Sequence, residues 1–169
     1  MWQILTQMVR TGLRTEPAPA PATQWHNEAR ELQRDIASMF GRALAIRHVD
    51  AGSCNGCELE IHALENPYYK LEGLGIRFVA SPRHADLLLV TGPVSANMVV
   101  ALERTWQATP DPKLVVAVGD CGCDGGVFGE NYACRGRVAN VIPVDVAIPG
   151  CPPPPIDLLR GILAAVRKR

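Results

Sequence analysis

The chain has 169 residues, enough for one domain with its own core and too few for two domains of ordinary size. Its 17 basic and 17 acidic residues leave no net charge, so nothing in the composition attracts a polyanion and nucleic acid is not an expected partner. With 14 prolines, 5% aromatic and 47% hydrophobic residues, the composition favours a subunit whose apolar faces contact other proteins.

The chemistry expected of the cysteines depends on whether the protein stays in a reducing compartment or is exported. No segment reaches the roughly 18 to 20 apolar residues of a bilayer span, and residues 1–12 lack the pattern of a signal peptide. We therefore expect the protein on the cytoplasmic side, where thiols stay reduced. Six cysteines there indicate metal or redox chemistry and not a disulfide framework.

The chain begins with an amphipathic, cationic segment. Apolar residues recur at helical spacing, among them Trp2, Leu5 and Val9, and the only charges in the first 15 residues are Arg10 and Arg14. This pattern predicts a short helix that either lies on a membrane surface or packs on a partner subunit; the sequence gives the two readings equal weight.

A proline-rich stretch follows that segment. Residues 16–23 carry proline at alternate positions, which forbids a helix and favours an extended, semi-rigid strut. We expect residues 1–23 to form an N-terminal amphipathic helix and linker, and residues 24–169 to form the domain.

Within the domain, apolar runs alternate with helical stretches. Residues 27–40 are predicted to form a helix that stops at Gly41. Five runs are predicted to be buried strands, at residues 44–49, 76–80, 87–91, 114–118 and 144–148, and three intervening segments to be helices, at residues 57–65, 95–106 and 155–167. This alternation predicts an α/β fold: an open, mainly parallel, flavodoxin-like sheet with helices on both faces.

Three of the predicted strands lead directly into cysteines. Cys54, Cys121 and Cys151 each follow the carboxyl end of a strand. Loops beyond the carboxyl ends of parallel strands converge on one crevice, so these distant cysteines are expected to meet in space.

The local sequence around the cysteines suits a negatively charged cluster. Cys54 and Cys57 have the C-x-x-C spacing at the start of a predicted helix, and Gly52 and Gly56 let the backbone approach closely. Cys151 is followed by four prolines that pre-set the start of the next helix. A four-thiolate iron-sulfur cluster is anionic, and helix amino termini favour anions.

Two other readings remain open on these residues alone. A structural zinc site also uses four thiolates, although it usually presents two close C-x-x-C pairs and only one pair exists here. A thioredoxin-like dithiol site would need Cys54 and Cys57 only, leaving Cys121 and Cys151 as small hydrophobic residues. The iron-sulfur cluster is the reading that uses all four.

Three segments carry a family resemblance. Residues 52–60 (GSCNGCELE), 119–126 (GDCGCDGG) and 144–153 (VDVAIPGCPP) resemble the small, cluster-bearing subunit of membrane-bound (group 4) nickel-iron hydrogenases and formate hydrogenlyases. The same family includes the 20-kDa, B-like subunit of NADH:quinone oxidoreductase. The resemblance covers about residues 42–165 in the right order, and three motifs together are far more specific than one.

This resemblance implies a function and a ligand set. The family's single 4Fe-4S cluster would fall on Cys54, Cys57, Cys121 and Cys151, leaving Cys123 and Cys134 as spectators, too few for a second cluster. The subunit would relay electrons to or from a large subunit with a nickel-iron or quinone site, without being catalytic alone. Its partners would also include a ferredoxin-like iron-sulfur subunit and integral membrane subunits, at the cytoplasmic face of the cell membrane.

One departure separates the branches of this family. The quinone-reducing branch typically has two adjacent cysteines in the first motif, whereas Asn55 and Gly56 separate them here, as in the hydrogenase branch. A hydrogenase or formate hydrogenlyase subunit is therefore the expected function, with the complex I-like subunit as the alternative. A zinc-stabilised interaction module is the alternative from a different class.

A few polar residues are weaker candidates. Glu60 lies one helical turn after Cys57 and is a candidate for proton transfer toward the large subunit, with an exposed helix glutamate as the simpler interpretation. Asp120, Arg83 and His84 could tune the cluster, and each is more simply interpreted as a solvated residue. His62 is interpreted as a helix-surface residue, because four thiolates complete the cluster.

Overall fold

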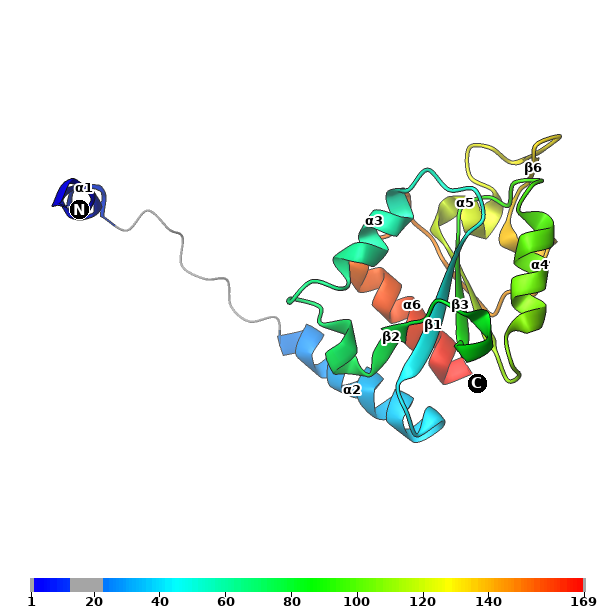
Figure 1. Ribbon diagram of the computed structural model, residues 1–169, viewed down its shortest axis with the longest axis horizontal. Helices are drawn as coiled ribbons and strands as arrows, with labels where there is room; N and C mark the ends of the chain where they lie inside the picture. The colour runs from blue at the N-terminus through cyan, green and yellow to red at the C-terminus, as the bar shows by residue number, and fades with distance from the viewer. Residues whose placement is uncertain (1, 13–22, 169) are drawn as a thin grey trace.

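The structure is a computed structural model that describes residues 2–12 and 23–168. All five predicted strands form one parallel sheet in the order β2–β1–β3–β4–β7. Figure 1 shows this sheet between its helices. The strands are β1 (Leu44–Asp50), β2 (Ile76–Phe78), β3 (Leu87–Thr91), β4 (Leu114–Val118) and β7 (Val146–Ile148). Because all pairs are parallel, every carboxyl end points to the same edge of the sheet.

Helices cover both faces of this sheet. One face carries α2 (Thr23–Phe40), α3 (Gly56–Ala63) and α6 (Pro155–Lys168), and their apolar residues pack with alternate strand residues such as Leu44 and Ile46. The other face carries α4 (Val99–Ala108) and the short turn η3 (Val138–Asn140), which pack on the strand residues of opposite parity. All five residues of β3 and of β4 are buried, as expected for strands covered on both sides. The predicted flavodoxin-like α/β fold is confirmed.

The predicted helices are found with shifted ends. α2 begins four residues earlier than expected and stops before Gly41, whose φ of 60° lies in the left-handed region that glycine adopts readily. α4 begins at Val99 and not at residue 95, because Ser95 is held elsewhere: its N–H donates to the carbonyl of Ala51, and it forms an isolated bridge with Cys134.

Several short elements were not predicted. They are α5 (Gly119–Asp124), the two-stranded hairpin β5 (Glu130–Asn131) and β6 (Cys134–Arg135), and the turns η1 (Leu71–Leu74), η2 (Pro82–His84) and η3. Of these, α5 matters most for function, because it carries Cys121 in its first turn.

The N-terminal segment forms the helix that its periodicity predicts. α1 (Trp2–Thr11) buries none of its residues, and its apolar side chains, including Trp2 and Val9, are exposed. The proline strut expected at residues 16–23 falls almost wholly outside the described residues. Among the described helices, none combines the length and the apolar character needed to cross a membrane.

Candidate functional site

The predicted ligand cysteines lie on three loops at the carboxyl-terminal edge of the sheet. Cys54 and Cys57 follow β1, Cys121 lies in α5 directly after β4, and Cys151 follows β7. Cys54 and Cys151 are exposed, whereas Cys57 and Cys121 are half-buried. The topology therefore brings together segments that are about 60 and 30 residues apart in sequence, as expected for parallel strands.

The electrostatics of the thiols show that all four lie close together. The pKa of the Cys57 thiol is raised to about 12, chiefly by burial and then by the negative charges of Glu58 and of the other three cysteines in this set. Burial also raises the pKa of Cys121, and negative charge on Cys151 and Cys54 adds to it. Four thiolates at this position repel one another, so a cationic centre between them would be strongly favoured.

Two glycines make room for the sulfur atoms. A Cβ on Gly119 would lie 2.7 Å from the Sγ of Cys57, and a Cβ on Gly126 would lie 2.8 Å from the Sγ of Cys121. Both glycines also have positive φ angles, 80° and 53°. Any side chain at either position would have to displace a thiol, so glycine is needed here for space as well as for backbone conformation.

Hydrogen bonds fix the loops that carry the cysteines. The carboxylate of Asp120 accepts a hydrogen bond from the N–H of Gly150 (2.7 Å), and the N–H of Asp120 donates to the carbonyl of Gly150 (2.9 Å). This pair joins the loops of Cys121 and Cys151. In the first loop, the carboxylate of Asp50 accepts from the N–H groups of Gly52 and Ser53, both at 2.8 Å.

This arrangement fits a group bound by four thiolates. The donors are all sulfur, which iron-sulfur clusters and zinc prefer, and Cys57 lies in the first turn of α3, where free backbone N–H groups favour negative charge. Among the described residues, no three His, Cys, Asp or Glu side chains are arranged around a single metal ion. In a 4Fe-4S cluster each thiolate bonds a different iron atom, so its four ligands need not share one ion.

A buried acid beside these cysteines was missed by sequence reasoning. Glu58 is only 6% exposed, and neither of its carboxylate oxygens has a hydrogen-bond partner. His48 lies beside it: its Nε2 is 3.6 Å from the carboxylate and 3.0 Å from the Oγ1 of Thr91. Burial lowers the pKa of His48, although the charge of Glu58 opposes that shift. No pattern in the sequence distinguishes Glu58 from an exposed helix residue.

The remaining two cysteines have backbone partners. The thiol of Cys123 donates to the carbonyl of Ala117 at 3.9 Å, and burial raises its pKa to about 11. Cys134 is buried in β6, and its sulfur accepts from the N–H of Gly136 at 3.3 Å. Their role as spectators stays a prediction that these contacts favour.

The polar residues considered for proton transfer or for tuning the cluster do not lie together in the structure. Glu60 is half-buried, and burial, Tyr68 and then the charge of Glu60 raise the pKa of Tyr69. The role of Glu60 in proton transfer stays a prediction. His62 is exposed, as expected. Arg83 and His84 lie in η2, which precedes β3 at the opposite edge of the sheet from the cysteines, so their positions do not favour a tuning role.

The chain is similar to subunits of membrane-bound enzyme complexes. It is 43% identical over 146 residues to a probable membrane-bound hydrogenase subunit of Pyrococcus furiosus, covering 85% of this chain and 87% of that protein. It is 42% identical over 148 residues to formate hydrogenlyase subunit 7 of Escherichia coli, covering 88% of this chain and 58% of that protein. A chain in the structure of the membrane-bound sulfane sulfur reductase, an archaeal respiratory membrane complex, superimposes with a TM-score of 0.66 at 34% identity, over 81% of this chain and 75% of that one.

A family model covers the segment that contains all four cysteines. Residues 54–165 match the model described as NADH ubiquinone oxidoreductase, 20 Kd subunit. This match spans more than half of the chain and confirms the resemblance drawn from the three motifs. The chain belongs to the family of the 20-kDa subunit of NADH:ubiquinone oxidoreductase, which its hydrogenase and formate hydrogenlyase relatives share.

Proposed function

We propose that this chain is the electron-transfer subunit of a membrane-associated oxidoreductase complex, with one 4Fe-4S cluster on Cys54, Cys57, Cys121 and Cys151. The observation that carries the proposal is the convergence of these four thiols on three loops at one edge of the sheet. When bound, such a cluster accepts and releases one electron at a time. The chain itself binds no substrate.

The residues of the chain have separable tasks in this role. The four thiolates hold the iron, and Gly119 and Gly126 leave space for two of the sulfurs. Backbone N–H groups at the start of α3 favour the negative charge of the site. The hydrogen bonds between Asp120 and Gly150 keep two of the loops in register, so that the thiols stay in place through each electron transfer.

An exposed apolar surface beside the cysteines supports a partner at this edge. The loop that follows Cys121 exposes Val127 and Tyr132, each to 98%, and Leu59 on α3 is also exposed. Exposed apolar groups of this kind mark protein interfaces. We propose that the large subunit covers this edge, since Cys54 and Cys151 are otherwise open to water.

The hydrogenase branch is the better-supported complex. Asn55 and Gly56 separate the cysteines of the first motif, and the hydrogenase and formate hydrogenlyase subunits align with more than four-fifths of this chain. The quinone-reducing complex is the second candidate, because the matched family model takes its name from that enzyme. In either complex the proposed partners are a large subunit, a ferredoxin-like iron-sulfur subunit and integral membrane subunits.

We further propose that the protein is peripheral, at the cytoplasmic face of the cell membrane. The exposed apolar side chains of α1, together with Arg10, suit an interfacial helix or a contact with a membrane subunit. Residues 1–23 would then be an attachment segment, and residues 24–169 the cluster-binding domain.

Anaerobic purification of the intact complex tests the proposal. Once this chain is separated anaerobically from the other iron-sulfur subunits, we expect it to hold about four iron and four sulfide, and to give a paramagnetic signal on one-electron reduction. Paired C-x-x-C motifs in the co-purifying large subunit would assign the hydrogenase branch. A separated chain that is colourless and contains zinc, or that contains no metal, would contradict the proposed function.

A further inference from the structure

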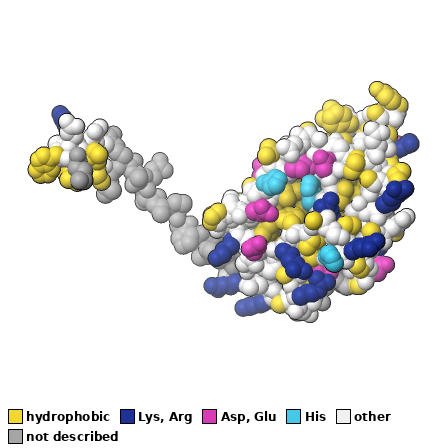
Figure 2. Space-filling view, in the orientation of Figure 1, with side chains coloured by type: hydrophobic (Ala, Val, Ile, Leu, Met, Phe, Trp, Pro, Cys, Tyr) yellow, Lys and Arg dark blue, Asp and Glu magenta, His cyan; other side chains and the backbone are white. Residues whose placement is uncertain are grey.

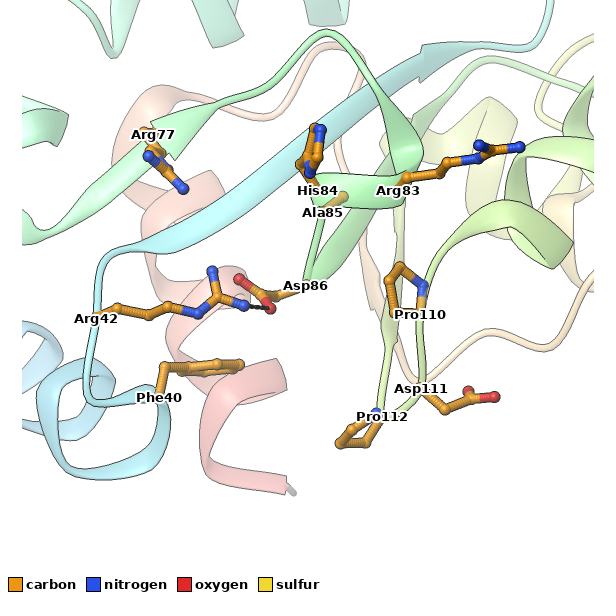
Figure 3. A pocket seen from close by; sticks show the side chains of 10 residues that line it. All are labelled: Phe40, Arg42, Arg77, Arg83, His84, Ala85, Asp86, Pro110, Asp111 and Pro112. Atoms are coloured by element: carbon orange, nitrogen blue, oxygen red, sulfur yellow. Dashed lines mark hydrogen bonds and ion pairs between the residues drawn. The ribbon is translucent and has the colours of Figure 1, made fainter.

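A polar hollow lies at the opposite edge of the sheet from the cysteines. It has a volume of about 460 Å³, and its lining includes Arg42 just before β1, Asp86 just before β3 and Pro112 just before β4 (Figure 3). All three positions mark the amino-terminal ends of strands. The seven residues of β1 separate this edge from the cysteine loops by about 20 Å at about 3.3 Å per residue.

Basic side chains dominate the lining of this hollow. Arg42 and Arg77 direct their guanidinium groups toward the same gap and His84 lies beside it, whereas Arg83 extends away from it (Figure 3). In the space-filling view, dark blue side chains gather over the lower part of the domain, although the chain as a whole has no net charge (Figure 2). On the face that Figure 2 shows, basic side chains therefore gather in this part of the domain.

The acidic groups of the hollow are already engaged. One carboxylate oxygen of Asp86 accepts from Arg42 at 2.7 Å, and the other accepts from the N–H of Ala45 at 3.0 Å. The second acid, Asp111, has an 82% exposed side chain and lies 3.4 Å from the Nζ of Lys113. Neither carboxylate is left to neutralise the remaining cationic groups.

The remaining donors have no acceptor in the described part of the chain. No hydrogen bond or ion pair links the side chain of Arg77 or of His84 to a described residue, and Arg42 uses one Nη on Asp86 while its side chain stays 55% exposed. Arginine has five N–H donors and no acceptor. The hollow therefore presents an excess of donors around a space that lacks an acceptor.

We propose that this hollow binds the phosphoryl group of an organic phosphate. A phosphoryl group carries a charge of about −1.5 to −2 and three strong acceptor oxygens, which matches the guanidinium donors of Arg42, before β1, and Arg77, in β2. A volume of about 460 Å³ leaves room for an organic body beside the phosphate, and Pro110 and Pro112 give that body an apolar surface. The source is either a soluble phosphate monoester or a phospholipid headgroup, whose phosphodiester carries a single negative charge and two free oxygens. Both offer anionic phosphate oxygens to the same donors.

Binding to the purified full-length, cluster-loaded protein tests this inference. The probes are glycerol 3-phosphate, inorganic pyrophosphate, succinate as the carboxylate control, a poly-glutamate peptide, and vesicles of phosphatidylcholine with or without phosphatidylglycerol. Arg77→Gln removes a cation without breaking a contact, and Arg83→Gln removes one at the margin of the hollow. Arg104→Gln, an exposed arginine on α4, is the matched control.

We expect one class of phosphate probe to bind, with affinity at least tenfold weaker in Arg77→Gln and changed less than twofold in Arg104→Gln. If Arg77→Gln weakens the binding of the soluble phosphates only, the ligand is a soluble phosphate. If it weakens the binding of phosphatidylglycerol vesicles only, the ligand is a lipid headgroup. Both results support the inference. Equal binding of succinate, binding of poly-glutamate without any phosphate probe, or an Arg77→Gln protein that binds like the unaltered chain would overturn it. We expect the cluster spectrum of Arg77→Gln to be unchanged, so a failure of this inference would not count against the electron-transfer proposal.

Discussion

Asp120 and Gly150 exchange two hydrogen bonds across the carboxyl ends of β4 and β7, through one side-chain carboxylate and two backbone amides. Each residue directly precedes a predicted cluster ligand, Cys121 or Cys151. The same pattern recurs at the other end of these strands, where the carboxylate of Asp145 accepts from Val115 at 2.8 Å. In that pair too, the backbone N–H of Asp145 donates to the carbonyl of Val115, at 2.9 Å.

The two aspartates allow a matched test of what holds the cluster loops. Asp120→Ala and Asp145→Ala should each lower the free energy of unfolding by about 2 kcal/mol, because each leaves a backbone N–H without its charged acceptor. Only Asp120→Ala should also release iron faster, measured by chelator competition. Equal iron-release rates in the two variants would show that the Asp120 pair serves the fold alone. Asp120→Asn, which keeps an acceptor oxygen but removes the charge near Cys121, should retain the cluster and raise its reduction potential.

The glycines beside the sulfurs give a second prediction. Gly119→Ala and Gly126→Ala should abolish or sharply reduce cluster occupancy, because the new Cβ atoms would meet Sγ atoms at 2.7 and 2.8 Å. Gly129→Ala is the control: its φ of 55° brings the same backbone strain, of about 1 kcal/mol, but no atom lies within 4 Å of the new Cβ. Iron content per folded chain is the measurement. Full occupancy in Gly119→Ala would mean that the cysteines do not converge as described.

Much of this site follows from the sequence because it depends on topology. Buried apolar runs identify the strands, and parallel strands place their carboxyl ends together, so the sequence alone groups Cys54, Cys121 and Cys151. α5 could not be predicted in this way. Residues such as Gly119, Asp120 and Gly122 have low intrinsic helix propensity, and the short helix forms because the loops around it are fixed by tertiary hydrogen bonds.

The buried acid was missed for a related reason. Spacing from Cys57 singled out Glu60, whereas the structure buries Glu58 against His48 from the preceding strand. That burial depends on how α3 packs across β1, which periodicity within one helix does not encode. The hairpin of β5 and β6 was missed because each strand has only two residues, too few for an alternation to be recognised.

His48 gives a prediction about pH. In the unfolded chain its pKa is near 6.5, and burial lowers the pKa in the folded protein, so the unfolded state binds more protons as the pH falls below 6.5. The stability that neutral His48 contributes is therefore fully present above about pH 6.5 and is lost as the pH falls toward the folded pKa. We expect His48→Gln to reduce the loss of thermal stability between pH 7.5 and pH 5.5. His62→Gln, at an exposed position on α3, should behave like the unaltered chain; identical slopes for all three proteins would contradict the assignment.

The N-terminal helix gives a prediction about attachment. Deleting residues 1–15 removes α1, whose apolar side chains are exposed and which buries none of its residues. We expect the shortened protein to keep its iron but to be lost from the membrane fraction on washing. Undiminished retention of the complex would refute an essential anchoring role and leave α1 as a contact with a partner subunit.

The most direct test of the account is iron analysis and paramagnetic spectroscopy of single cysteine variants. Cys54→Ala, Cys57→Ala, Cys121→Ala and Cys151→Ala should each lose the spectrum of an intact 4Fe-4S cluster, because each removes one of four thiolates. Cys123→Ala is the control, since its half-buried thiol contacts the backbone of β4; it should keep about four iron atoms per chain. A Cys121→Ala or Cys151→Ala protein with full iron content and an unchanged spectrum would contradict the proposed ligand set.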